Sequence, residues 1–425
     1  MNMMILGSGG RECAFYLKIR QSNLVKKLYF APGNGGVENE FSVNIDINNF
    51  KEVEETVKKY QINFLLVGPE LPLVNGIKDY FSKALPGLHV FGPNGYGAQL
   101  EGSKVFSNDF MVAEKIPTAI SKEASSFDSA LTILKNHSLP VVIKVDGLAA
   151  GKGVTIHDDK NEAQHQLDLV FNKKIFGDAG NKVLFQEFMQ GKEASLFAIC
   201  NGKDAIYLPT ACDYKRVFDD GKGPNTGGMG SYAPGTILTP DNIAFVHKNI
   251  VQKVIDKFNY TGILYVGLMI HENDISVVEF NCRLGDPETQ SVLPLMESDI
   301  VPYLLWSTGA EENVYKVTGK GYYYVPQKPG YSLNVVISAA GYPGNYEKNL
   351  ELHLPEKLPE NVHIVHAGTK KIDGKLLSNG GRILNIVGYD KDARKVKEKV
   401  YDFINSLKKI NDFSKLHYRT DIGKL

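Results

Sequence analysis

The sequence predicts a multidomain protein of mixed α/β and α+β class with a parallel, doubly wound α/β domain at its N-terminus. Short apolar strands alternate with helical segments over residues 1–100, which is typical of a parallel sheet covered on both faces. The chain has 425 residues, too many for one hydrophobic core, so several domains are expected. The last hundred residues are rich in strands and contain one helix, which predicts a small α+β domain there.

The first hundred residues contain four expected strands, at 3–6, 27–30, 63–67 and 89–91. Helices are expected up to residue 20, near 50–60 and near 73–83. The strands run into glycine- or proline-containing loops, GSGGR at 7–11, APGNGG at 31–36, VGPE at 67–70 and FGP at 91–93. Open α/β sheets bind ligands at the carboxyl ends of their strands, so we expect these loops to share one binding edge.

The rest of the chain alternates between helical and strand-rich stretches. A helix is expected from residue 101 to 114, ending before Pro117. Further helices are expected at 128–136, 161–171 and 390–408, and strands at 140–145, 182–187, within 194–212 and 262–280, and at 331–339, 363–369 and 382–388. We therefore divide the chain into an N-terminal domain at 1–102, a connecting helix at 103–122, subdomains at 123–192 and 193–325, and a C-terminal domain at 328–425.

Composition and charge exclude several classes of protein. Hydrophobic residues make up 43% of the chain, charged residues 23%, and the net charge is +0, so neither a nucleic-acid partner nor a membrane surface is indicated. The N-terminus has no basic lead, and no apolar stretch could cross a bilayer. The four cysteines show no metal-ligand spacing, which favours reduced thiols and a cytoplasmic location.

Residues 277–290, VVEFNCRLGDPETQ, carry the most specific chemical signal. A β-branched run ends in Glu279 and Asn281, and strand alternation points both side chains to one face. Arg283 follows in the next loop. Carboxylate and amide oxygens suit Mg²⁺, which is commonly held by few protein ligands together with substrate phosphates. The alternative is a polar loop that closes a strand at a solvated edge.

A glycine loop at 146–154, DGLAAGKGV, follows the apolar strand that contains Lys144. Its glycine spacing is not that of a Walker A motif, and we interpret it as a glycine flap over phosphates. The flap includes Gly151, Lys152 and Gly153. Lys144, inside VVIKV, is expected to be buried and paired and to neutralise a phosphate from the sheet; the alternative is a surface lysine.

Two further segments have weaker signals. Glu187 and Phe188 close a strand whose backbone groups could bind an adenine, and Glu193 could accept ribose hydroxyls. Between 210 and 230, charged residues that include Asp213 precede a loop of small residues, whose amides could surround a small anion; a solvent-exposed loop is the alternative. The loop residues are Asn225, Thr226, Gly227 and Gly228.

The first loop, GSGGR, is only partly similar to a dinucleotide-binding fingerprint. Glu12 occupies the third glycine position, and no acid ends the second strand to hold a ribose, so NAD(P) and FAD are disfavoured. Its amides could still approach a phosphate at a helix N-terminus, and a tight turn without a ligand is the alternative.

These motifs occur in an order that closely resembles the phosphoribosylamine–glycine ligase family, also called glycinamide ribonucleotide synthetases. The resemblance extends over the whole chain, through GSGGRE, APGN, VGPE, EGSK, DGLAAGKGV, GPNTGGMG, EFNCRLGDPETQ, HAGTK and NGGR. It implies an ATP-grasp core of two subdomains between the N- and C-terminal domains. It also implies ligation of glycine to 5-phosphoribosylamine in purine synthesis, with ATP as co-substrate, Mg²⁺ or Mn²⁺ as cofactor, and glycyl phosphate as intermediate.

The resemblance assigns roles to particular residues. Lys104 and Lys144 would contact ATP phosphates under the flap, Glu187 and Phe188 would hold adenine, and Glu193 the ribose. Glu279 and Asn281 would bind the metal, and Arg283 would face the acyl phosphate or a substrate phosphate. Asp213 and residues 225–228 would border the glycine and phosphoribosylamine sites. The phosphoribosylamine end would be lined by Gly9, Gly10, Asn34, Pro69 and Glu70.

Two positions depart from the pattern of these relatives. Cys13 stands where the family usually has histidine, and Gly267 stands where many ATP-grasp enzymes have an acid before the metal-binding glutamate. Glu279 would then serve alone or with another acid. The open alternatives are an ATP-grasp ligase for another carboxylate such as formate or bicarbonate, a nucleotide-binding regulatory protein without turnover, and a dinucleotide oxidoreductase. A monomer or a dimer is expected.

Overall fold

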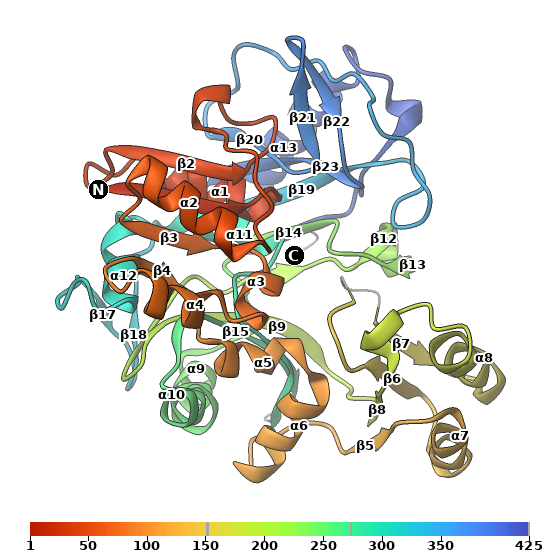
Figure 1. The fold of residues 1–425 in the computed structure, drawn as a ribbon. Helices are drawn as coiled ribbons and strands as arrows, with labels where there is room; N and C mark the ends of the chain where they lie inside the picture. Colours follow the sequence, from red (N-terminus) through yellow and green to blue (C-terminus); the bar gives the residue numbers. More distant parts are fainter. Residues whose placement is uncertain (150–152, 273, 424–425) are drawn as a thin grey trace.

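The computed structural model describes residues 1–149, 153–272 and 274–423. Figure 1 shows the N-terminal domain beside the C-terminal domain, and one small lobe, built from β5–β8 with α7 and α8, standing apart from both. The ends of the strands and the loops between these parts meet near the centre of the molecule. The site described below lies in this central region.

The N-terminal domain is a parallel sheet in the order β2-β1-β3-β4. Apolar side chains on both of its faces are buried, as expected for a doubly wound sheet. The elements are β1 (Asn2–Gly7), α1 (Gly10–Ile19), β2 (Lys27–Pro32), α2 (Phe50–Tyr60), β3 (Phe64–Val67), α3 (Glu70–Val74), α4 (Ile77–Ala84) and β4 (His89–Phe91).

Two helices lead into the small lobe, a four-stranded antiparallel sheet in the order β5-β8-β6-β7. Helices α7 and α8 pack on this sheet and form a core of their own. The elements are α5 (Gly95–Gly102), α6 (Lys104–Ala113), β5 (Ser121–Ala124), α7 (Phe127–Asn136), β6 (Val141–Val145), β7 (Val154–His157), α8 (Lys160–Phe171) and β8 (Val183–Glu187).

A six-stranded, mostly antiparallel sheet, β16-β15-β9-β10-β18-β17, forms the centre of the molecule. Its strands are β9 (Lys192–Asn201), β10 (Ala205–Tyr207), β15 (Thr261–His271), β16 (Asp274–Asn281), β17 (Val317–Thr318) and β18 (Tyr323–Tyr324). The associated helices are α9 (Pro240–Val246), α10 (Gln252–Phe258), α11 (Glu288–Val292) and α12 (Val301–Ser307), with a π-helical turn at His247–Val251.

The C-terminal sheet takes strands from the middle of the chain. Its order is β11-β14-β19-β23-β20, with β24 also beside β19, so β11 (Cys212–Asp213) and β14 (Gly230–Ala233) continue the C-terminal domain. The other elements are β12 (Arg216–Phe218), β13 (Lys222–Asn225), β19 (Tyr331–Ala339), β20 (Val362–His366), β21 (Thr369–Ile372), β22 (Lys375–Ser378), β23 (Arg382–Asp390), α13 (Ala393–Leu407) and β24 (Leu416–His417). Short 3₁₀ turns occupy Asn39–Phe41, Gly177–Gly180, Asp219–Gly221, Leu293–Leu295 and Phe413–Lys415.

Three expected elements are divided in the structure. The helix expected near 73–83 is split into α3 and α4 at Gly76, whose φ of 80° is left-handed and stops the first helix. The helix expected at 101–114 is split at Ser103, whose hydroxyl caps α6 by accepting from Phe106 N. The strand expected at 363–369 ends at His366, and β21 starts a separate hairpin with β22.

Candidate functional site

A β-bulge in β16 sets the directions of the side chains at the end of that strand. Pairing with β15 places Gly267 opposite Glu279 and Leu268 opposite Val277, so Val278 is an extra residue. One extra residue reverses the faces of all residues after it. The bulge therefore turns Glu279 away from the face to which Val277 belongs.

Beyond the bulge the strand alternates regularly. Phe280 and Cys282 join the hydrophobic core. Glu279 and Asn281 lie on the opposite face, where they pair with residues two apart on β15. The prediction that these two side chains share a face is confirmed.

Glu279 lies in a field of positive charge. Burial would raise the pKa of this carboxyl, but the charges of Lys215, Lys104 and Lys144 outweigh it and lower the pKa to about 2. Lys144 on β6 is 5% exposed, and its Nζ donates to the carbonyl of the bulge residue Val278 at 3.0 Å. The prediction of a buried, paired lysine is confirmed, and burial lowers the pKa of Lys144 to about 8.

The oxygen donors at this strand end have no protein partner within the described chain. Neither the Glu279 carboxylate nor the Asn281 amide makes a side-chain hydrogen bond or ion pair with a described residue. The described part of the chain contains no group of three or more His, Cys, Asp or Glu side chains suited to a metal ion. An ionised carboxylate and an amide on one face suit a hard cation that takes its remaining ligands from a substrate.

A small hollow opens beside Glu279. It is lined by Glu193, Ala194, Ser195, Lys215, Tyr265, Gly267, Leu268, Val278 and Glu279. Gly267 keeps this space open, because a Cβ there would lie 3.3 Å from Glu279 Cγ. The glycine at this position therefore leaves room beside the carboxylate.

Further acids lie around this hollow on other elements. Lys215 Nζ pairs with Glu193 Oε2 at 2.7 Å. Burial, together with the charges of Glu193 and Glu279, raises the pKa of Asp213 even though Lys215 opposes this. Burial also raises the pKa of Glu288, to about 7, with Asp213 as the next contribution. Asp213 and Glu288 are thus candidates for an acid that assists Glu279 or accepts a proton.

Arg283 is held by two carboxylates from other elements. Its Nη2 donates to Glu101 Oε1 at 2.6 Å, and its Nε lies 3.5 Å from Glu70 Oε2. Glu101 also accepts from the Cys282 amide at 2.8 Å, so it fixes the backbone directly after Asn281. Arg283 and Glu70 were predicted separately as substrate contacts, and the structure brings them together.

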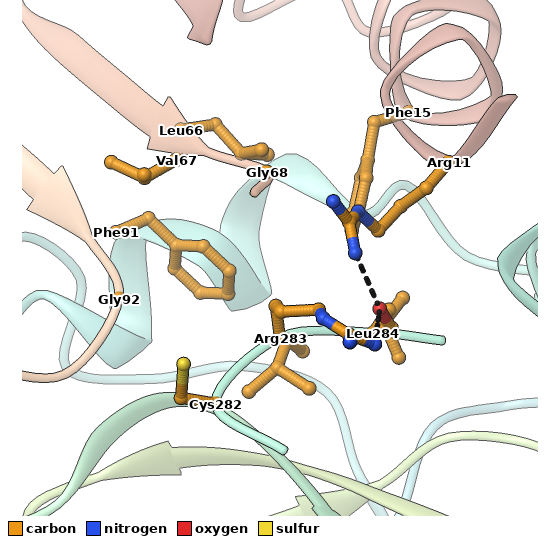
Figure 2. A pocket seen from close by; sticks show the side chains of 11 residues that line it. Arg11, Phe15, Leu66, Val67, Gly68, Phe91, Gly92, Cys282, Arg283 and Leu284 are labelled. Atoms are coloured by element: carbon orange, nitrogen blue, oxygen red, sulfur yellow. Dashed lines mark hydrogen bonds between the residues drawn. The ribbon is translucent and has the colours of Figure 1, made fainter. Parts of the chain in front are cut away.

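A small cavity separates the N-terminal domain from the loop after β16. It is lined by Arg11, Phe15, Leu66, Val67, Gly68, Phe91, Gly92, Ile263, Cys282, Arg283 and Leu284. Figure 2 shows Arg11 reaching from α1 toward this loop, where its Nη1 donates to the carbonyl of Leu284 at 3.2 Å. Arg283 lies beside that contact. The two guanidinium groups thus meet where the domains join.

The first glycine loop is occupied by the chain's own carboxylates. Gly9 N donates to Glu12 Oε2 at 2.8 Å, and Arg11 N donates to Asp286 Oδ2 at 3.4 Å. Glu12, at the position of the third glycine, folds back over the first loop. It also lies against Gly68, which follows β3, and a Cβ on Gly68 would lie 2.2 Å from Glu12 Oε1. The amides of Gly9 and Arg11 therefore have protein acceptors, and whether the loop approaches a phosphate stays a prediction. Whether Gly9 and Gly10 line the substrate site stays a prediction.

The amides of the 225–228 loop are also satisfied. Thr226 N donates to Lys215 O at 2.8 Å, Gly227 N to Tyr342 Oη at 3.0 Å, and Gly228 N to Thr226 Oγ1 at 2.9 Å. These three amides therefore have protein acceptors, and whether the loop surrounds an anion stays a prediction. That the loop, with Asn225 at the end of β13, borders the substrate site remains a prediction.

The residues expected at the nucleotide lie around the small lobe. Glu187 ends β8 and is exposed, as is Phe188 at 42%, so both are accessible. Lys104 begins α6, and its amide donates to Asp146 O at 3.0 Å, next to the start of the flap. Gly153 precedes β7, whereas Gly151 and Lys152 lie outside the described residues.

The residues expected at the phosphoribosylamine end lie at domain contacts. Asn34 Nδ2 donates to Ser8 O and His366 O, both at 2.9 Å, and so joins the first loop to the C-terminal domain. Pro69 caps α3, which begins at Glu70. Cys13 is 1% exposed, and burial raises the pKa of its thiol to about 12. All four cysteines are free and buried, as predicted for reduced thiols.

Sequence reasoning noted Asp286 in the loop after the metal-site strand but missed the contacts through which carboxylates hold this region together. Glu101 binds Arg283 and Asp286 pairs with Arg382, in each case across segments, whereas Glu12 binds the Gly9 amide within its own loop. Arg11 and Arg382 carried a signal, because a mainly lysine-rich chain keeps arginine in its glycine-rich motifs. Which carboxylate each guanidinium meets depends on tertiary structure.

Comparisons with known proteins identify this architecture. Residues 102–289 match the ATP-grasp (A) domain of phosphoribosylglycinamide synthetase, which defines the chain as an ATP-grasp protein. Residues 1–101 match the N domain and 332–425 the C domain of the same family. The chain belongs to the phosphoribosylglycinamide synthetase family. Among the described residues, no helix is long and apolar enough to cross a membrane.

Two bacterial relatives match over almost their full length. The chain is 42% identical to a phosphoribosylamine–glycine ligase of Leptospira interrogans (100% of this chain, 98% of that protein) and 38% identical to one of Caldanaerobacter subterraneus (100% and 99%). The crystal structure of phosphoribosylamine–glycine ligase from Thermotoga maritima has a TM-score of 0.81 at 34% identity (99% of this chain, 100% of that one). The biotin carboxylase domain of a Hydrogenobacter thermophilus carboxylase, solved with MgADP, shares the fold with a TM-score of 0.74 at 15% identity (98% and 91%).

Proposed function

We propose that this protein is an ADP-forming carbon–nitrogen ligase that joins glycine to 5-phosphoribosylamine and produces glycinamide ribonucleotide, ADP and phosphate. Membership of the family, with full-length relatives of that name, supports the activity. The observation that carries the proposal is the unpartnered pair Glu279 and Asn281, set among lysines at one strand end. We further propose that this step belongs to purine biosynthesis in the cytoplasm.

The residues at the strand end suit a divalent cation. Glu279 is ionised, with its pKa lowered to about 2 despite burial, and Asn281 adds an amide oxygen on the same face. We propose that these two hold Mg²⁺ or Mn²⁺, with Asp213 or Glu288 as an assisting acid. The cation would neutralise charge on the transferring phosphoryl group.

The first chemical step we propose is attack of the glycine carboxylate on the γ-phosphate of ATP, which gives glycyl phosphate and ADP. Phosphoryl transfer depends on alignment and on compensation of charge, so no protein nucleophile is needed. Lys104 and Lys144 are proposed to hold the phosphates, with Lys144 fixed by its bond to Val278 O at 3.0 Å. Arg283, held by Glu101 and Glu70, would stabilise the acyl phosphate.

The second step is attack of the phosphoribosylamine nitrogen on the acyl carbon, with release of phosphate. The amine must lose a proton, which a nearby carboxylate or the leaving phosphate can accept. The phosphoribosylamine end is proposed to lie along Gly9, Gly10, Asn34, Pro69 and Glu70. Adenine is proposed at Glu187 and Phe188, the ribose at Glu193, and glycine between Asp213 and the 225–228 loop.

A coupled assay of ADP release, omitting each substrate in turn, tests the proposal. ADP release is expected to require ATP, a divalent cation and glycine, and to reach its full rate only with phosphoribosylamine. Hydroxylamine is expected to trap glycyl phosphate as the hydroxamate. Release supported by formate or bicarbonate in place of glycine, or ATP binding without turnover, would contradict the proposal.

A further inference from the structure

The C-terminal sheet reaches into the proposed active site through β11, which carries Asp213, and through β14. Strand β14 pairs with β19 over Gly230–Ala233 and Ser332–Val335, in the same sheet as β23. Residues 225–228, proposed above to border the glycine and phosphoribosylamine sites, are separated from β14 by Met229 alone. One end of this loop is therefore attached to the C-terminal domain.

Two C-terminal side chains bind both polar groups of Gly227. Its N–H donates to Tyr342 Oη at 3.0 Å, and its carbonyl accepts from Arg382 Nη1 at 2.7 Å. The same Nη1 also contacts the carbonyl of Asp286 at 2.7 Å and that of Gly228 at 3.5 Å. Arg382 thus joins the 225–228 loop to the loop that follows the metal-site strand.

The close contacts leave little room for this loop to move. A Cβ on Gly227 would lie 3.0 Å from Arg382 Cζ. At Gly228, where φ is +111°, a Cβ would lie 2.3 Å from Pro287 Cδ. Arg382 is 20% exposed and also lies 3.4 Å from Asp286 Oδ1, so protein groups compensate its charge.

We propose that Tyr342 and Arg382 are positioning residues, which hold the Gly227 peptide and so set the 225–228 loop at the amino-acid end of the site. This inference rests on the proposed function. The C-terminal domain would then contribute to the binding of glycine and phosphoribosylamine without touching either. Neither side chain of this pair hydrogen-bonds to a residue proposed at the nucleotide, so the effect on ATP is expected to be the smaller one.

Steady-state kinetics of Tyr342→Phe and Arg382→Lys test the inference. For Tyr342→Phe we expect kcat/KM for glycine to fall about five- to tenfold, as for loss of one neutral hydrogen bond. For Arg382→Lys, which keeps the charge but loses the multiple contacts, a fall of about 10- to 100-fold is expected. KM for ATP should stay within about twofold, because the loop does not border the nucleotide.

Tyr346→Phe and Arg394→Lys are matched controls. The Tyr346 hydroxyl makes no hydrogen bond to a described residue, and Arg394 is exposed on α13. Both variants should match the wild type. A purely structural role for Tyr342 and Arg382 would instead lower the melting temperature and the active fraction while leaving the KM values unchanged, and this would overturn the inference.

Hydrogen exchange provides a readout that needs no turnover. In Tyr342→Phe the Gly227 amide loses its acceptor, so a peptide covering residues 222–233 should exchange faster, while peptides from β16 stay unchanged. Wild-type kinetics and unchanged exchange in both variants would overturn the inference. Absence of glycine-dependent ADP release in the wild type would instead contradict the proposed function, so the two failures are distinguishable.

Discussion

Two clusters of charged residues lie close together in this protein, and they differ in how their charges are balanced. At the first glycine loop, Glu12 binds Arg11 and the Gly9 amide, and Asp286 binds the Arg11 amide. At the end of β16, Glu279 has no such partner among the described residues. The comparison indicates that paired charges join domains. An ionised carboxylate without a protein partner instead marks the place where a ligand is expected.

The largest effect is expected from Glu279→Gln, which removes the unpaired charge. ATP turnover should fall by at least about 1,000-fold, because the variant loses the anionic metal ligand. Because the neighbouring lysines lower the pKa of Glu279, its charge also contributes to stability, so a modest fall in the melting temperature of the variant is expected, too small to account for the loss of turnover. Glu398→Gln, on the exposed side of α13, is the control. Near-normal kcat for Glu279→Gln would remove this residue from the metal site.

Arg283→Ala tests whether this arginine acts in the reaction or only joins domains. Its guanidinium is paired with Glu101 and Glu70 and also lies at the proposed site. If it stabilises the acyl phosphate, kcat/KM should fall about 100- to 1,000-fold. Removing it also leaves the buried Glu101 without its charge partner, so the melting temperature should fall. A few-fold change in kcat/KM together with lower stability would show that Arg283 only joins domains.

The ionisation of Lys144, beside Glu279, is expected to make the activity depend on pH. Burial lowers its pKa to about 8, so in the free protein the ammonium is lost as the pH rises through 8. The kcat/KM for ATP should then decrease about tenfold per unit at higher pH. In Lys144→Arg, which stays charged, this alkaline decrease should disappear, although the maximum rate is lower. An unchanged alkaline limb in that variant would assign the ionisation to another group.

Gly267→Ala is expected to have the smallest effect. The added Cβ would lie 3.3 Å from Glu279 Cγ, so the carboxylate must shift by a few tenths of an ångström. The apparent KM for Mg²⁺ should rise about two- to fivefold with little change in stability. A pronounced loss of stability with unchanged Mg²⁺ dependence would show that Gly267 serves packing and not the site.

Local patterns in the sequence predicted much of the fold. Helix α2 and strand β4 have the expected bounds, because an amphipathic helix and a short apolar strand are encoded by neighbouring residues. The breaks at Gly76 and Ser103 were missed, since a glycine or a serine within a helical pattern indicates a break only weakly. The extension of the C-terminal sheet by β11 and β14 joins segments far apart in sequence.

The site was predictable where one strand carries it. Glu279 and Asn281 are two residues apart, so their shared face follows from alternation, although the bulge at Val278 that selects this face does not. The partners of Arg283 and Gly227 come from distant segments. Spacing within one segment does not reveal which distant groups a folded chain pairs, and for this reason the protein acceptors of the Gly9 and Gly227 amides were not predicted.

A crystal structure with a non-hydrolysable ATP analogue and Mn²⁺ is the most direct test of the metal site proposed at Glu279 and Asn281. Anomalous scattering locates the metal without reference to the protein atoms. We expect a metal peak within coordination distance of a carboxylate oxygen of Glu279 and of the amide oxygen of Asn281, next to the phosphates of the analogue. A peak coordinated elsewhere, with both side chains turned away from the metal, would contradict this expectation.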